Sequence, residues 1–197
     1  MSKEKQALNR DRPSTEEQIR AHTIGELRPL SGKILIVDYD PRWLELFQRE
    51  AERIRSVLRS QALQIEHAGS TSVPSLAAKP IIDMVLVVNN SEDEYSYVPA
   101  LERAGYVLRI REANWHEHRM FNGPDTEINL HVFSSGCPEI DRILAFRDWL
   151  RRDAADRDLY ARTKRALVER EWKYIQNYAD AKTAVIEEIM GRALQHK

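Results

Sequence analysis

The side chains best suited to chemistry lie in one short stretch, between Gly69 and Asp83. Gly69 has no Cβ, so its backbone N–H can approach a ligand closely. A helical turn beginning near Ser72 would add free N–H groups that attract an anion, and Lys79 adds a positive charge. The hydroxyl donors in this stretch are Ser70, Thr71 and Ser72. This combination predicts a phosphate-binding turn.

Asp83 lies inside the apolar run from Ile81 to Val88. A carboxylate in a buried strand is costly unless it is paired, hydrogen-bonded or bound to a metal. One interpretation is a structural ion pair with Lys79 or an arginine. The other, which we favour because perturbed acids gather at functional sites, is that Asp83 holds Mg²⁺ or Mn²⁺ against phosphate oxygens.

The elements that must position these residues can be inferred from the flanking pattern. Leu63 and Ile65 alternate as in a strand, and the run after Lys79 has the continuous apolar character of a strand buried on both faces. The stretch therefore predicts a strand, a small-residue turn with a short helix, and a second strand that carries the acid.

A Gly-Ser pair followed by an acid on a strand resembles the signature of the nucleotidyltransferase superfamily. The longer strings His67–Pro74 and Lys79–Asp83 resemble the GrpB family within it. Four further strings share the resemblance, namely Asn129–Val132, Phe146–Leu150, Tyr160–Lys164 and Tyr178–Lys182. The resemblance implies an α/β fold with a mixed sheet, flanking helices and C-terminal helices.

One departure from the superfamily pattern concerns catalysis. Active nucleotidyltransferases usually carry a second acid two residues after the first, on the same strand face, and here that position is Val85. A site with one acid cannot assemble two metals. We therefore expect nucleotide or phosphate-ligand binding with weak or absent nucleotidyl transfer.

The resemblance adds candidates outside the central stretch. It makes Arg147, Lys164 and Lys182, on three expected helices, a basic wall that contacts phosphates. His131 lies in a strand where the superfamily often places a third acid, which makes it a candidate catalytic residue beside Asp83. His67 precedes the turn and could either cap the strand end or point into the cleft with the phosphate-binding residues.

A second class of function rests on the histidines. An expected strand over residues 115–121 places His116 and His118 on one face, as two metal ligands would be placed. With His131 and Asp83 they could form a zinc site, and the protein would then be a metal-dependent hydrolase. A third alternative is a non-catalytic module for a nucleotide or coenzyme A, because the resemblance includes GrpB-like domains fused to a dephospho-coenzyme A kinase.

Composition limits the partners. The chain has 197 residues and a formal net charge of −1, so overall charge does not favour nucleic acid. No apolar run approaches the roughly 18 residues of a membrane helix, and the N-terminus lacks a signal-peptide core. Cys137 is the single cysteine, which fits a reducing compartment. We expect a cytoplasmic protein whose partner is a phosphorylated small molecule.

The remaining pattern predicts one domain over residues 31–197 after an N-terminal extension, residues 1–30. The extension is mobile or forms one short helix from Ser14 to Ala21, because Ser14 and Glu17 have capping-box spacing. Strands are expected at 33–37, 106–110, 115–121 and 127–133. Helices are expected after Asp40 as N-cap, at 97–104, from Pro138, at 154–169 and at 180–195.

Overall fold

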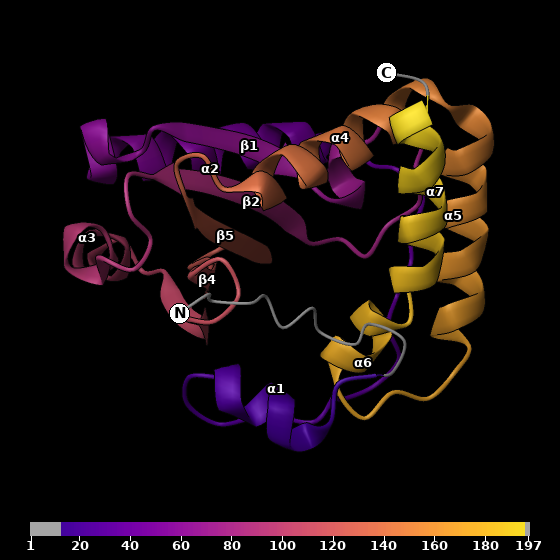
Figure 1. Cartoon of the computed structure of the whole chain (residues 1–197), viewed down its shortest axis with the longest axis horizontal. Coiled ribbons are helices and arrows are strands. Elements are labelled where there is room, and N and C mark those ends of the chain that lie inside the picture. The colour runs from indigo at the N-terminus through magenta and orange to yellow at the C-terminus, as the bar shows by residue number, and fades with distance from the viewer. Residues whose placement is uncertain (1–12, 196–197) are drawn as a thin grey trace, which may run out of the picture.

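The computed structural model describes residues 13–195 and shows a five-stranded mixed sheet between two layers of helices (Figure 1). The strands are β1 Gln64–Ala68, β2 Ile82–Val88, β3 Val107–Glu112, β4 His118–Asn122 and β5 Ile128–Ser134. Their order is β1-β2-β5-β4-β3, and only β2 and β5 run parallel to each other. The expected strand, turn and acid-bearing strand are therefore adjacent, because β1 and β2 pair directly.

Alternation along β2 divides the core into two layers. Met84 and Leu86 face α2 (Arg42–Leu58) and α3 (Val98–Arg103) in the larger hydrophobic cluster. Val85 and Val87 face the opposite way, toward Ile140. That second face is covered by α4 (Pro138–Arg152), which lies across β1 and β2 in Figure 1. Asp83 has the same parity as Val85, so it lies on the α4 side of the sheet.

Helix α2 follows the predicted pattern closely. Trp43, Ala51, Ile54 and Leu58 are all buried, which confirms the apolar face expected from their spacing. The helix begins one residue later than expected: Pro41 occupies the N-cap position. The Asp40 carboxylate still accepts a hydrogen bond from the backbone N–H of Arg42 at 2.9 Å.

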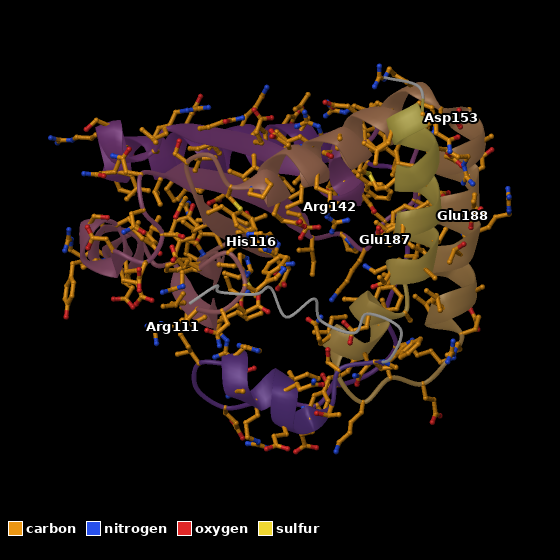
Figure 2. The ribbon with its side chains drawn as sticks, in the orientation of Figure 1. Arg111, His116, Arg142, Asp153, Glu187 and Glu188 are labelled. Atoms are coloured by element: carbon orange, nitrogen blue, oxygen red, sulfur yellow. The ribbon has the colours of Figure 1, made fainter. Side chains whose placement is uncertain are left out.

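The C-terminal helices form a separate group beside the sheet (Figure 1). These are α5 (Ala154–Val168), α6 (Ile175–Asp180) and α7 (Thr183–Gln195). Val73 and Leu76, just after the central turn, pack into a cluster with Tyr160 of α5 and Ile189 of α7. This cluster fixes the turn against the C-terminal helices. Arg142 of α4 and Glu187 of α7 face each other at 3.5 Å and connect the two groups (Figure 2).

The N-terminal segment from residue 13 onward contains α1 (Glu16–His22). Its capping box is formed by Thr15 and Gln18, one residue later than the expected Ser14 and Glu17. The segment is anchored at both ends. The backbone N–H of Ser14 donates to Asp180 of α6 at 2.7 Å, and Thr23 forms a β-bridge with Ile110 of the edge strand β3.

Three expectations about secondary structure are corrected. Residues 33–37 do not form a strand, and only Val37 makes an isolated bridge, to Ala78. Strand β4 begins at His118 rather than at residue 115, because His116 and Glu117 have positive φ angles of 53° and 52° and form a turn. The helix expected over 180–195 is present as α7 but begins at Thr183, and the separate short helix before it, α6, was not predicted.

Candidate functional site

The centre of the site is the turn between β1 and β2. It consists of Gly69 followed by a short 3₁₀ helix, Ser70–Ser72. Gly69 has φ 63° and ψ −170°, a conformation essentially restricted to glycine. A Cβ at this position would lie 2.3 Å from Oδ2 of Asp83. Gly69 therefore approaches the Asp83 side chain closely, and its predicted approach to a phosphate stays a prediction.

Asp83 is held between two side chains of β5. Its Oδ1 accepts a hydrogen bond from Nδ2 of Asn129 at 2.9 Å, and Nε2 of His131 lies 4.0 Å from the same oxygen. The Asp83 side chain remains 32% exposed. Partial burial raises the pKa of Asp83, whereas the Asn129 hydrogen bond and the lysines Lys182, Lys79 and Lys164 lower it. A cation bound here would stabilise the ionised carboxylate.

Lys164 of α5 reaches the turn from the side of the C-terminal helices. Its Nζ donates to Oγ of Ser70 at 2.8 Å and to the carbonyl of Ala77 at 2.5 Å, and it lies 4.7 Å from the centre of the Tyr160 ring. Only 2% of the residue is exposed. Burial, with smaller contributions from Lys182 and Arg165, lowers the pKa of Lys164 from 10.5 to about 7.

Two further lysines act on the same carboxylate. Lys79 is half-buried, and burial lowers its pKa although Asp83 and Glu127 act in the opposite direction. Lys182 lies 4.8 Å from the centre of the Tyr178 ring and interacts electrostatically with Asp83, Lys79 and Lys164. Within residues 13–195, none of these lysines has a carboxylate within ion-pair distance. The site therefore carries an excess of positive charge.

Three of the predicted phosphate ligands are directed elsewhere. His67 is buried and stacks on Phe47 of α2 at 4.7 Å, which places it on the sheet face opposite Asp83. Its Nε2 is 3.1 Å from Oγ1 of Thr71, which in turn donates to the carbonyl of Ile81. Burial lowers the pKa of His67 to about 4. Ser72 donates to the carbonyl of Gly69 at 2.6 Å, so Ser70 is the hydroxyl that contacts the lysine group.

Arg147 lies behind the turn rather than in the group around Asp83. Its guanidinium donates to Glu66 at 2.8 Å, to the carbonyl of His67 at 3.0 Å and to Asp148 at 2.8 Å. Two carboxylates therefore satisfy this arginine, and its contacts anchor α4 to β1. Arg151 has a similar role, because its Nη2 donates to the carbonyl of Ser72 at 2.9 Å.

The histidines do not form the zinc site considered above. His116 is exposed in the turn before β4 and does not share a strand face with His118. His118 and His131 are hydrogen-bonded to each other at 3.0 Å. No group of three or more potential metal ligands occurs in the described part of the chain. Burial, with a smaller effect of His118, lowers the pKa of His131 to about 3.

Sequence reasoning did not single out Asn129 or Glu112 as site residues. Asn129 pairs with Asp83 in the parallel register of β2 and β5, and Glu112 is hydrogen-bonded to His118. A usable signal was present for Asn129, because Asn129 and His131 are alternate polar residues in an otherwise apolar strand. Glu112 offered no such signal, since its role depends on the pairing of β3 with β4.

Val85 occupies the position of the missing second acid. It shares the face of Asp83 and is completely buried, in a cluster with Ala68, Phe133 and Ile140 of α4. A carboxylate could not replace it without losing this packing. The residue opposite Val85 in the parallel register of β2 and β5 is His131. At this level of the sheet, the polar side chain on the Asp83 face therefore comes from β5.

These features define a class of α/β protein in which a glycine-serine turn presents an acid and several lysines at one edge of a mixed sheet. The chain belongs to the GrpB family: the model of the GrpB protein family matches residues 33–192. The expected family and the α/β fold with a mixed sheet are thus confirmed.

Two relatives cover most of the chain. A UPF0157 protein of Halalkalibacterium halodurans is 61% identical over 181 residues, which span 92% of this chain and 93% of that protein. The crystal structure of the conserved protein GrpB from Enterococcus faecalis aligns with a TM-score of 0.72 and 34% identity, over 82% of this chain and 98% of that one.

None of the helices between residues 13 and 195 has the length and apolar character that a membrane crossing requires.

A more distant relative is larger. A dephospho-CoA kinase of Mycolicibacterium paratuberculosis is 27% identical over 199 residues, covering 88% of this chain and 49% of that protein. The chain therefore corresponds to about half of that kinase.

Proposed function

We propose that this protein binds a nucleotide or another phosphorylated small molecule at the turn Gly69–Ser72, with Mg²⁺ or Mn²⁺ held by Asp83. The observation that carries the proposal is the convergence of Lys79, Lys164 and Lys182 on one carboxylate. Buried or half-buried ammonium groups with no carboxylate within ion-pair distance are unfavourable, and Asp83 alone does not balance the three. A bound phosphate would supply the missing negative charge and contact the Lys164 and Ser70 pair directly.

The residues present fit one divalent cation. Asp83 offers carboxylate oxygen, the donor that Mg²⁺ and Mn²⁺ prefer, and its partial exposure leaves room for water and phosphate oxygens. Such a cation would neutralise charge on the bound phosphates. Asp83, Ser70 and the lysines then orient the ligand, which is the protein's main contribution in phosphoryl chemistry.

Catalysis is expected to be weak or absent in the protein alone. Two-metal transfer needs carboxylates that hold a second cation, and buried Val85 leaves no place for one on β2. His131 lies where the superfamily often has a third acid and could assist catalysis there. Nucleotidyl transfer therefore stays a secondary proposal. A coenzyme A precursor is a second candidate ligand, favoured by the similarity to part of a dephospho-CoA kinase.

Melting temperature tests the binding proposal, because a ligand that binds only the native state stabilises it by mass action. The full chain would be heated with each nucleoside triphosphate and with coenzyme A precursors, with and without Mg²⁺ or Mn²⁺. We expect a cation-dependent rise for at least one ligand that is reduced in Lys182→Met. Lys173→Met is the matched control, since Lys173 is an exposed lysine paired with Glu16. Equal responses in all three proteins would contradict the proposed site.

Lys164 predicts a pH dependence of binding. Its pKa of about 7 means that the free protein loses this positive charge as pH rises above 7, so affinity for a triphosphate should fall by up to about tenfold per pH unit. Between pH 7 and 10.5 the unfolded chain binds more protons at this lysine, so the free energy of unfolding should rise with pH. Titration calorimetry at pH 6.5, 7.5 and 8.5 would measure the affinity. Lys164→Arg, which stays charged, should remove the part of the pH dependence that comes from this side chain, and an unchanged slope in that variant would refute the assignment.

A further inference from the structure

A hydrogen-bonded chain of three residues leads to Asp83 from the β3 edge of the sheet, on the face that carries Asp83. Oε2 of Glu112 lies 2.7 Å from Nδ1 of His118, and Nε2 of His118 lies 3.0 Å from Nδ1 of His131. The remaining ring nitrogen of His131, Nε2, is directed to Asp83 and lies 4.0 Å from its Oδ1. The three residues come from β3, β4 and β5, which are adjacent strands.

The order of donors along this chain determines which nitrogen of His131 is free. An ionised carboxylate can only accept, so the proton between Glu112 and His118 is on Nδ1 of His118. When both imidazoles are neutral, Nε2 of His118 is unprotonated and accepts from Nδ1–H of His131. Neutral His131 is left with a lone pair on Nε2, and this lone pair faces the Asp83 carboxylate.

Packing holds the imidazoles in this arrangement. The centre of the His118 ring lies 5.1 Å from that of the nearly parallel His131 ring and 4.8 Å from that of Phe133. Trp115 packs nearly perpendicular to it, with its ring centre 5.3 Å away. His118 is buried, whereas the side chain of His131 is 31% exposed. His131 can therefore be reached by an ion from solvent, while the group that orients it cannot.

We propose that His131 Nε2 is the second protein ligand of the cation held by Asp83, that His118 and Glu112 are its positioning residues, and that the site therefore prefers Mn²⁺ to Mg²⁺. This inference rests on the proposed function. An imidazole nitrogen strengthens binding of first-row transition ions, whereas Mg²⁺ retains oxygen ligands and water. A metal-bound histidine typically donates its other N–H to a partner that fixes its tautomer, as His131 does here through His118 to Glu112.

The two protein donors explain why the cation and the phosphate ligand should bind together. The described residues contain no set of three or more ligands, so an ion at Asp83 and His131 needs several further oxygens. Phosphate and water would supply them. The ion alone is therefore expected to bind weakly, and inorganic tripolyphosphate, which has no base to recognise, should increase its retention.

Electron paramagnetic resonance of Mn²⁺ tests the assignment without measuring activity. The full chain would be titrated with Mn²⁺ alone and with Mn²⁺ plus tripolyphosphate, and coupling of the bound ion to ¹⁴N would be recorded. We expect nitrogen coupling in the wild type and its loss in His131→Ala. His118→Phe, which keeps a stacked ring but removes the acceptor, should weaken Mn²⁺ binding by about 10–100-fold.

Two further variants sharpen the test. His131→Asp replaces nitrogen with oxygen and should shift the preference toward Mg²⁺, measured by competition of Mg²⁺ with bound Mn²⁺. His116→Asn is the matched control, because asparagine tolerates the positive φ of this exposed residue. It should leave the nitrogen coupling and the affinity unchanged.

The outcomes separate this inference from the proposed function. Cation-dependent phosphate binding without nitrogen coupling, or with coupling that persists in His131→Ala, would overturn the His131 assignment and leave the proposed function intact. If the wild type retains no Mn²⁺ in either arm, the His131 assignment fails, and the proposed function fails with it only when no nucleotide or coenzyme A precursor raises the melting temperature. Three-ligand zinc binding that displaces Mn²⁺ and survives in His131→Ala would also overturn the assignment.

Discussion

Replacing Gly69 with alanine is expected to lower the free energy of unfolding by roughly 4 kcal/mol, from backbone strain and overpacking together. The new Cβ would lie 2.3 Å from Oδ2 and 2.9 Å from Cβ and Cγ of Asp83. The backbone at φ 63° and ψ −170° is also unfavourable for any residue with a side chain. Either Asp83 or the turn must move, so the ligand-induced stabilisation should also be lost. Denaturant unfolding monitored by circular dichroism would measure the change.

Two comparisons separate the causes of this effect. Gly136 has φ 78°, and a Cβ added there would meet no described atom within 4 Å, so Gly136→Ala should cost only about 1–2 kcal/mol from the left-handed backbone. Adding Asp83→Ala to Gly69→Ala removes two of the three close contacts and should recover part of the loss. If Gly69→Ala and Gly136→Ala cost the same, contact with Asp83 is not what constrains position 69.

Asp83→Asn is expected to abolish cation-dependent ligand binding, with a loss of at least about 100-fold, because it removes the proposed direct ligand of the cation rather than an outer-shell partner. The same substitution should stabilise the free protein at pH 7. The pKa of Asp83 is raised in the folded state, so between pH 3.8 and the folded-state value the native protein holds more protons than the unfolded chain. The free energy of unfolding contributed by this group therefore falls as pH rises through that window.

Thermal unfolding at pH 4 and pH 7, with and without ligand, measures both effects in one series. Asp38→Asn is the matched control, because the Asp38 side chain is 91% exposed and is paired with Arg165 at the surface. A variant at Asp83 that is less stable at pH 7 yet still responds to ligand would contradict both expectations.

Pyrophosphate release from labelled nucleoside triphosphates should be low in the wild type, and robust release that disappears in Asp83→Asn would show that another group completes a catalytic site.

The fold could be predicted from sequence where local pattern determines structure. The periodicity of α2, the Pro138 start of α4 and the strands on both sides of Gly69 are local properties. The predicted strand over 33–37 was wrong because β-branched composition does not specify a pairing partner, and only Val37 finds one. The predicted strand over 115–121 began three residues too early, because His116 and Glu117 adopt left-handed conformations that interrupt an extended strand.

The site could be predicted only in part for a related reason. Gly69, Ser70, Lys79 and Asp83 are close in sequence, so one short motif indicates them together. The surroundings of Arg147 are partly tertiary: Glu66 of β1 satisfies it together with the neighbouring Asp148, and the contact with Glu66 does not follow from its place on a helix. The orientation of His67 depends on the register of β1 against β2, which pairs Ala68 with Asp83 and so directs His67 to the other face.

The N-terminal segment has a consequence for how the protein behaves in solution. Strand β3 is at the edge of the sheet, where unpaired backbone groups can recruit a strand from another molecule. Residues 23 and 24 cover part of this edge through the Thr23–Ile110 bridge and the 2.8 Å hydrogen bond from Ile24 N–H to the Arg109 carbonyl. A chain shortened to residues 33–192 would keep the turn, Asp83 and the lysines but would expose this edge. Self-association and poor solubility, rather than a defective binding site, are the failures to anticipate in such a fragment.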